Sequence, residues 1–320
     1  MERFLDIIIP EYNCKEEYME RLLQSISYQA NVDLSEIGII IVNDNSSNKL
    51  SNELFDKYQN LNIEYLIKDI NEGQGLTRQY GLDNSKAEYV TFLDQDDILH
   101  GPSALSIVIE NLKLYKMDML YTDYIRYNPY DDTIKIMTYE DLLCLHGVFF
   151  KRNTLVEGNY RFNNKIRMYE DTYFMQIAAK TLKPKYLNIP TYVWYLNKSS
   201  QSAVENVGTK MIQKRLYEFL VANIDAVRFV ANKNVDVKEF FKKTFIYLTI
   251  VTKSDLFIEI DVSNEERLLC DFYNEFGNDC IIDDNKDRDI IKSSIDQARQ
   301  DYGINNITMT PNEFLKKMNL

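Results

Sequence analysis

The sequence predicts an α/β protein in which a mostly parallel sheet, covered by helices on both faces, is followed by a helical region. In the first part of the chain, short apolar runs alternate with apolar residues at helical spacing. Parallel neighbours need such crossovers, because the chain must return to the same edge of the sheet before the next strand begins. From about residue 204 onward, helical spacing replaces this alternation.

Four apolar runs in the first hundred residues predict buried strands, and each is followed by a segment with helical spacing. In the first such segment Met19, Leu22, Leu23 and Ile26 fall on one helical face. The first strand is ended by Pro10, which lacks a backbone N–H. We therefore expect strands at 4–9, 38–42, 63–67 and 89–92, and helices over 15–27, 50–58, a segment that carries Arg78, and 105–112.

The alternation of strands and helices then changes at two points in the chain. Strands are expected at 119–124, 134–137, 146–152 and 192–195, with a helix opening at Glu170 and Asp171, where acids suit the helix dipole. The polar stretch Ser199–Ser202 is the expected boundary, so the sequence predicts one domain over 1–203, with halves of about 1–100 and 101–203. A helical domain is expected over 204–320, with helices at 211–231, 237–253, 265–276 and 287–300 and a last turn after Pro311.

Composition excludes several classes of protein. The 320 residues are 45% hydrophobic and 27% charged, which is ordinary for a globular protein. A net charge of −12 argues against a nucleic-acid partner, because binding needs a basic surplus. Glu2 and Asp6 interrupt the first apolar run, which excludes a signal peptide, and Phe245–Val251 is too short to cross a bilayer. The four cysteines have no metal-site spacing, and we expect them reduced in a cytoplasmic protein that can lie peripherally at the inner membrane face.

Polar residues follow each of the first four predicted strands. Pro10, Asp44, Asn71 and Asp94 all stand where a strand ends or just beyond it. In open parallel sheets, ligands bind outside the carboxyl ends of the strands, so these residues predict a site at one edge. The G-x-G-x-x-G turn of dinucleotide-binding folds and the G-x-x-x-x-G-K-[ST] phosphate loop are both missing from the sequence.

The fourth of these strands ends in three carboxylates within four residues. Because side chains alternate along an extended backbone, Asp94 and Asp96 can project to the same side. Two such carboxylates suit a hard divalent cation that keeps positions open for phosphate oxygens. The alternative is an acidic turn that closes a strand without binding anything.

The sequence contains five motifs in order: Ile7–Asn13, Ile40–Ser47, Asn71-Glu72-Gly73 with Arg78 and Gly81, Phe92–Asp97, and Glu170-Asp171. In this order they resemble the family 2 glycosyltransferases, which are inverting enzymes with the GT-A fold that use nucleotide-activated sugars. The resemblance covers about the first 200 residues, and small bacterial enzymes that modify wall or surface polymers are the most similar in appearance.

The resemblance implies a nucleotide-sugar site on the strand ends. Pro10 and Tyr12 would line the base pocket, and Asp44 would accept a hydrogen bond from the uracil imide. Arg78 would pair with the diphosphate, a contact suited to its forked donors. The implied binding set is completed by Asn13, Asn71, Gly73, Asp94 and Gln95.

The resemblance also implies the catalytic groups. Asp94 would meet the ribose or the metal, and Asp96 would ligate a Mn²⁺ or Mg²⁺ ion that bridges the diphosphate. Asp171 would be the general base that takes the proton of the acceptor hydroxyl. In-line displacement needs both kinds of group, because the leaving diphosphate must be neutralised on one face of the sugar and a base must act on the other.

The chain departs from the family pattern at several positions. Asn43 stands where the family usually has a second aspartate, and Thr77-Arg78-Gln79 replaces the usual Ala-Arg-Asn. Leu196-Asn197-Lys198 stands where an arginine, and sometimes a histidine, is common. His146 falls in a region that lies near the acceptor in the family, where a core histidine and a functional one are equally plausible.

We therefore expect a metal-dependent inverting glycosyltransferase that moves a sugar from a UDP-sugar to a hydroxyl acceptor on a glycan or polymer. The chain is expected to bind no nucleic acid, and its C-terminal helices can join subunits into a homo-oligomer. A GT-A-fold protein that binds nucleotide sugars without catalysis is the main alternative. A sugar-phosphate nucleotidylyltransferase is disfavoured, because Pro10-Glu11-Tyr12-Asn13 is not a glycine-rich basic loop.

Overall fold

The computed structural model describes residues 3–138, 144–197, 209–277 and 280–320. The chain divides into two compact units, Met1–Val204 and Glu205–Leu320. The boundary predicted at 203/204 falls within residues 198–208, which lie outside the described residues.

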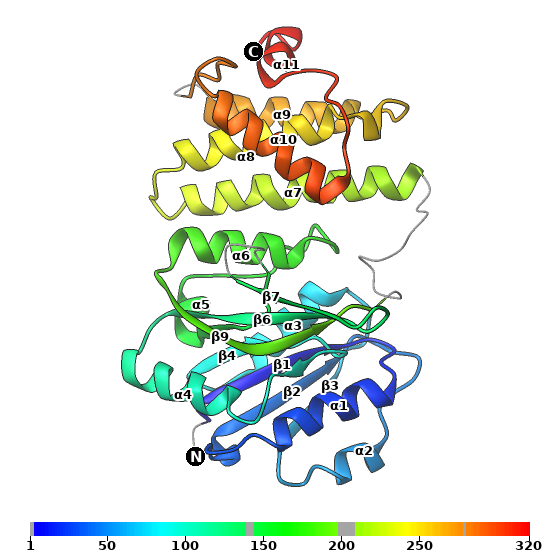
Figure 1. The fold of residues 1–320 in the computed structure, drawn as a ribbon, viewed down its shortest axis with the longest axis vertical. Coiled ribbons are helices and arrows are strands. Elements are labelled where there is room, and N and C mark those ends of the chain that lie inside the picture. Colours follow the sequence, from blue (N-terminus) through cyan, green and yellow to red (C-terminus); the bar gives the residue numbers. More distant parts are fainter. Residues whose placement is uncertain (1–2, 139–143, 198–208, 278–279) are drawn as a thin grey trace. The chain divides into compact units, whose positions relative to one another are not determined.

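The described part of the first unit is built on one mixed sheet, coloured from blue to green in Figure 1. Its strand order is β3-β2-β1-β4-β8-β6-β9-β5, with β7 paired to β6. The four strands β3, β2, β1 and β4 are parallel, as is the β6–β9 pair, whereas β8, β7 and β5 pair antiparallel. The strands are β1 Leu5–Glu11, β2 Ile37–Asn43, β3 Asn62–Ile67, β4 Tyr89–Phe92, β5 Ile98–Leu99, β6 Met119–Asn128, β7 Thr133–Met137, β8 Val148–Lys151 and β9 Pro184–Tyr195.

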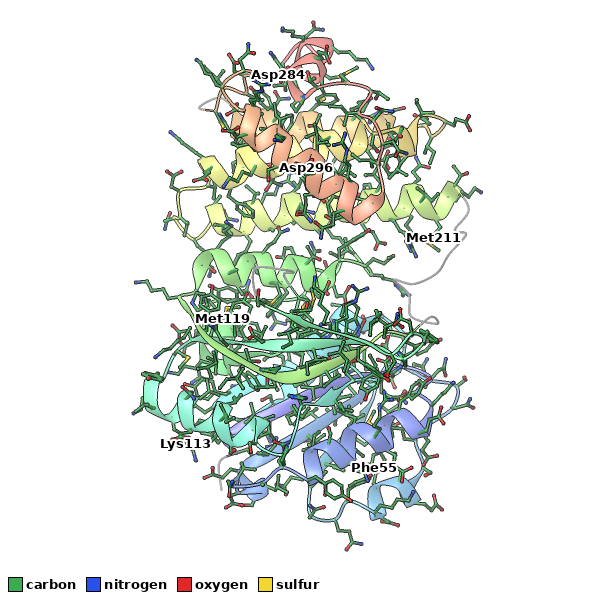
Figure 2. All side chains as sticks on the ribbon, viewed as in Figure 1. Phe55, Lys113, Met119, Met211, Asp284 and Asp296 are labelled. Carbon is green, nitrogen blue, oxygen red and sulfur yellow. The ribbon has the colours of Figure 1, made fainter. Side chains whose placement is uncertain are left out.

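Helices cover both faces of this sheet, with α1, α2 and α4 on one side and α6 on the other (Figure 1). Along the fully buried β1, Ile7 and Ile9 join the core beneath α1 and α4, and Ile8 packs toward Gly81 of α3 on the opposite face. Side chains fill the layers between sheet and helices (Figure 2). The helices of this unit are α1 Glu16–Ser27, α2 Asn52–Asp56, α3 Gln74–Asn84, α4 Ala104–Tyr115, α5 Arg152–Glu157 and α6 Glu170–Thr181.

Several local features differ from the sequence prediction; for example, β1 continues through Pro10 to Glu11, and the short strand β5 was not predicted. His146 was expected to begin a strand, but it precedes β8 in a turn, because Gly147 has a φ of +68° and its carbonyl accepts both the N–H (2.9 Å) and the hydroxyl (3.0 Å) of Thr122. Arg152 was expected to end that strand but begins α5. Strand β9 begins at Pro184, earlier than expected, because it pairs with β6 on both sides of a register shift near Asp123.

The second unit is helical in its described residues, which confirms the prediction. Phe245 of α8 packs against Phe272 of α9 and Phe314 of α11, with ring centroids 6.3–6.4 Å apart. Among the described residues, no helix has the length and apolar character to span a bilayer. The helices are α7 Thr209–Ala231, α8 Lys238–Thr252, α9 Ser263–Phe276, α10 Arg288–Tyr302 and α11 Pro311–Lys317.

Candidate active site

The ends of the parallel strands bring the predicted site residues of the first half to one edge of the sheet. Pro10 is opposite Val42 in the β1–β2 register, and Ile8 is opposite Phe92 in the β1–β4 register. The backbone pairing continues beyond the strands, since Asp44 N–H donates to the Glu11 carbonyl at 2.8 Å. The loops after β1, β2, β3 and β4 therefore meet, as predicted from the positions of polar residues.

The loop after β1 presents an exposed aromatic ring. Tyr12 is 49% exposed, and its backbone N–H donates to the side-chain oxygen of Gln95 at 2.9 Å. Asn13 has a φ of +46°, and its side-chain oxygen accepts the N–H (3.0 Å) and hydroxyl (2.8 Å) of Ser47. The backbone of Tyr12 is thus held in place, while its side chain stays exposed to a planar ligand. Pro10, two residues earlier in the chain, is buried in β1.

Asp44 organises the loop after β3. Its carboxylate accepts the backbone N–H groups of Glu72 (3.0 Å) and Gly73 (2.8 Å), and its carbonyl accepts the Asn71 side-chain amide at 3.1 Å. Lys68 Nζ donates to the same carboxylate at 2.7 Å, and both side chains are about 95% buried or more. Gly73 has a φ of +93°, a conformation that favours glycine. Asp44 therefore fixes the shape of the 71–73 loop.

A buried polar cluster lies beneath these loops. Asn43 donates its side-chain N–H groups to Glu11 and to the Tyr65 hydroxyl, and its own oxygen accepts Ser46 N–H at 2.7 Å. The Ser46 hydroxyl also donates to Glu11, at 3.0 Å. Burial raises the pKa of Glu11, and these hydrogen bonds oppose the shift. Asn43, which departs from the family pattern, supplies a donor where an aspartate would face a second buried carboxylate.

Asp94 is oriented by two side chains of α3. Arg78 Nη2 donates to its Oδ1 at 2.6 Å and Gln74 Nε2 donates to the same oxygen at 2.9 Å. Burial favours the protonated acid, but the charge of Arg78 and the neighbouring His146 hold the pKa of Asp94 below its usual range. The Arg78 side chain is only 4% exposed. Its observed partners are carboxylates, and its pairing with a diphosphate stays a prediction.

Helix α6 begins at the same site with two acids in different environments. Glu170 Oε1 accepts Arg78 Nη1 at 2.8 Å. Burial and the neighbouring Asp171 raise the pKa of Glu170 to about 7, although Arg78 opposes the shift. Asp171 is partly exposed, and its Oδ1 accepts Thr172 N–H at 2.7 Å. The base role of Asp171 stays a prediction, and the partial exposure of its side chain is compatible with it.

Two carboxylates of the acidic run after β4 lie close to a histidine, and together they offer atoms of the kind that bind metal ions. One atom each from Asp94, Asp97 and His146 lies within 4.8 Å of the others. Both Asp97 oxygens are already hydrogen-bonded, to the Tyr192 hydroxyl at 2.5 Å and to Tyr195 N–H at 2.8 Å. Asp96, the predicted ligand, is outside this group, and its Oδ2 accepts the Asn197 amide at 3.0 Å. Carboxylate oxygens with an imidazole nitrogen nearby are a donor set that suits Mn²⁺, and the carboxylates alone suit Mg²⁺.

His146 is enclosed by aromatic rings. It stacks on Tyr192 with centroids 4.8 Å apart and lies 5.2 Å from both Tyr124 and Trp194. Burial disfavours its charged form, but Cys144, Asp94 and Asp97 raise the pKa of His146 well above its ordinary value. The ring therefore links the acidic run to β6 and β9.

Sequence reasoning missed several residues of this site. Lys68 and Gln74 were not singled out, and Glu11 was treated only as part of a loop. A signal existed for Gln74, because it lies one helical turn before Arg78 and carries a donor on the same face. No local signal marks Glu11 or Lys68, because the partners that place them in the site, Asn43 for Glu11 and Asp44 for Lys68, are 32 and 24 residues away in the chain.

Comparisons with known proteins agree with this architecture. The sequence model of glycosyl transferase family 2 matches residues 6–180, which is more than half of the chain. The teichoic acid poly(glycerol phosphate) polymerase of Staphylococcus epidermidis is 26% identical over 60% of this chain and 28% of its own length. The processive diacylglycerol beta-glycosyltransferase of Mycoplasma genitalium is 25% identical over 57% and 52%, respectively. The chain thus spans about half or less of the length of these relatives.

Solved structures show the same fold at low identity. Staphylococcus aureus TarS in complex with UDP-GlcNAc matches with a TM-score of 0.67 and 15% identity, covering 93% of this chain and 92% of that one. A mannosyltransferase of Pyrobaculum calidifontis in complex with GDP-Man and Mn²⁺ matches with a TM-score of 0.54 and 14% identity, covering 93% and 81%. These similarities confirm the predicted GT-A fold with its helical C-terminal region. The family match shows that the chain belongs to glycosyl transferase family 2.

Proposed function

We propose that this chain moves a sugar from a UDP-sugar to a hydroxyl of a surface or wall polymer, with inversion and with the help of a divalent metal ion. The observation that carries the proposal is the convergence at one sheet edge of an exposed ring on Tyr12, an oriented carboxylate on Asp94 and a partly exposed acid on Asp171. A nucleotide, a diphosphate and an acceptor hydroxyl require these three kinds of group.

The base of the nucleotide is expected on the Tyr12 side. The ring offers a stacking face, and Gln95 holds the backbone that carries it. Asp44 Oδ2 accepts one hydrogen bond in the structure and has a second lone pair for the uracil imide N–H. Lys68 Nζ donates to that carboxylate at 2.7 Å and holds it in place.

Asp94 and Asp96 are the proposed metal ligands, which is also the pair expected from the sequence. We prefer Asp96 to Asp97 because Asp97 is 1% exposed and accepts hydrogen bonds from Tyr192 and Tyr195 of β9, whereas Asp96 is partly exposed. When bound, a divalent ion would neutralise the charge that develops on the leaving diphosphate. Gln74 and Arg78 would hold Asp94 in one rotamer throughout.

Asp171 is the proposed base. It would accept the proton of the acceptor hydroxyl as that oxygen attacks the anomeric carbon and the bond to the diphosphate breaks. The inversion of configuration follows from attack on the face opposite the leaving group. The relatives and neighbours that act on teichoic acids, or that bind UDP-GlcNAc, support a UDP-sugar donor and a polymer acceptor. We further infer a cytoplasmic enzyme, at the inner membrane face where such polymers are assembled, in which residues 1–203 are catalytic and 204–320 contact the acceptor or a second subunit.

A thermal-shift panel tests the donor. The full chain is heated with UDP-GlcNAc, UDP-GalNAc, UDP-glucose, UDP-galactose and GDP-mannose, each with Mn²⁺ and with a chelator. A UDP-sugar with Mn²⁺ should give the largest shift, and that donor should then release UDP in the presence of the enzyme. A larger shift with GDP-mannose would overturn the UDP assignment, and binding without any turnover would favour a catalytically inactive binding protein.

A further inference from the structure

Helix α3 holds the carboxylate of Asp94 from one side. Gln74 and Arg78 are one turn apart and donate to the same oxygen, Oδ1, at 2.9 and 2.6 Å. Two donors from one helical face fix the rotation of this carboxylate. They also leave its second oxygen, Oδ2, on the side of His146, whose Nε2 is 3.8 Å away.

The same helix holds the start of α6. Arg78 uses its other terminal nitrogen, Nη1, for Glu170, the first residue of α6. At Gly75, an added Cβ would lie 2.8 Å from Cγ and 2.9 Å from Cβ of Glu170, so only a glycine allows this approach. Helices α3 and α6 are therefore joined by both a buried ion pair and a close steric fit.

The local sequence does not fix the start of α6 by itself. The helix has no side-chain cap, and the preceding Tyr169 has a φ of +62°, an uncommon conformation for a residue with a side chain. Such a conformation persists where surrounding contacts determine it. The contacts of Glu170 with Arg78 and Gly75 are of this kind.

We infer that Glu170 is a positioning residue that sets Asp171 at a fixed place relative to Asp94, through its ion pair with Arg78 and its contact with Gly75. The inference rests on the proposed function, in which Asp171 takes the acceptor proton. Since a misplacement of about 1 Å can lower a rate by about 100-fold, a rigid link between the donor side and the base side has a direct effect on turnover.

Replacing Glu170 by glutamine has different effects on turnover if Glu170 positions α6 and if it transfers a proton. The side-chain oxygen of glutamine can accept the hydrogen bond from Arg78 Nη1, but it cannot take up a proton at neutral pH. Glu170→Gln should therefore keep most turnover if Glu170 positions α6. It should be as inactive as Glu170→Ala if Glu170 is itself the base.

The experiment compares both variants in the full chain. UDP affinity is measured by calorimetry, and turnover is measured as UDP release from the UDP-sugar that gives the largest thermal shift with the wild-type chain. Glu170→Ala should lower turnover by about 10- to 100-fold while UDP affinity changes by less than about 3-fold, and Glu170→Gln should recover turnover to within about 5-fold of wild type. Amide exchange over residues 170–175 should be faster in the alanine variant.

Gly75→Ala provides a second variant that removes no charge, in case Glu170→Ala does not fold. It should lower turnover in the same direction with UDP affinity retained. Arg161→Met is the matched control, because it removes an exposed ion pair (3.1 Å, to Asp83) that also joins α3 to the segment before α6. Full turnover in Gly75→Ala, or equal loss in both Glu170 variants, would overturn the inference. A wild-type chain that binds no UDP-sugar would instead overturn the proposed function.

Discussion

Replacing Asn43 by aspartate should destabilise the first unit through one contact between the ends of β1 and β2. Asn43 is fully buried and donates to Glu11, which is 1% exposed, and to the Tyr65 hydroxyl at 2.8 Å. Aspartate has nearly the same shape but no N–H donor. The variant would therefore place a second carboxylate against Glu11 and leave that acid without one of its hydrogen-bond donors.

The size of the effect follows from these contacts. Losing a donor to a buried charged acceptor costs about 1–3 kcal/mol. Two charges about 4 Å apart repel by about 4 kcal/mol at an effective dielectric constant of about 20. The pair can relieve this repulsion by binding one proton, so the net loss at neutral pH should be about 3–5 kcal/mol. Since that proton is bound in the folded state, the loss should grow as the pH rises and shrink as it falls.

Trp194, the single tryptophan, lies on β9 and reports on the first unit by its fluorescence. Urea unfolding should show the Asn43→Asp deficit at neutral pH, with a smaller deficit near pH 5. The double variant Glu11→Gln with Asn43→Asp restores one amide beside one carboxylate and should recover most of the stability. A deficit below about 1 kcal/mol at neutral pH, or no recovery in the double variant, would refute the reasoning.

Three further outcomes are expected. Asp171→Asn should lower turnover by about 10²- to 10⁴-fold with UDP affinity nearly unchanged; retained turnover in a UDP-release assay would exclude Asp171 as the base. The raised pKa of Glu170, about 7 against 4.5, makes its contribution to stability fully present below pH 4.5 and lost as the pH rises through 7. Relative to Glu170→Gln, the wild-type chain should lose roughly 1–3 kcal/mol across that window in urea unfolding, and a constant difference would contradict this. Mn²⁺ should tighten UDP binding in calorimetry, and Asp96→Ala should abolish that gain while His146→Gln keeps it; the reverse result would assign the ion to Asp94, Asp97 and His146.

The sequence predicts much of the fold because its strands are continuous apolar runs that end in polar turns. Ile7 to Ile9 are buried on both faces of the sheet, so the local run of apolar residues is enough to predict that they lie in the core. The start of β9 at Pro184 is different, because residues 184–190 are mostly half-exposed and are recruited by pairing with β6. The turn at Gly147 likewise depends on Thr122, which is distant in the chain.

For the site residues too, the sequence predicts their positions but not their contacts. The strand-end positions of Asp44 and Asp94 follow from the pattern, because any parallel sheet gathers such residues at one edge. What each carboxylate contacts does not follow, since Lys68, Arg78 and Glu170 meet their partners only after the sheet and helices pack. Arg78 looks like a solvent-facing cation in the sequence, yet the fold buries it between two acids.

The charges of the site support a need for an added cation. Lys68 contacts two acids, Asp44 at 2.7 Å and Glu72 at 3.1 Å. Arg78 also contacts two, Asp94 and Glu170. Each of these buried cations is therefore already balanced, and neither carries surplus positive charge for a diphosphate. In a chain of net charge −12, an anionic donor would approach an edge that also carries Asp96 and Asp97. A divalent ion on Asp94 and Asp96 would reverse this local repulsion, so donor affinity should depend on the metal more steeply than on any single basic side chain.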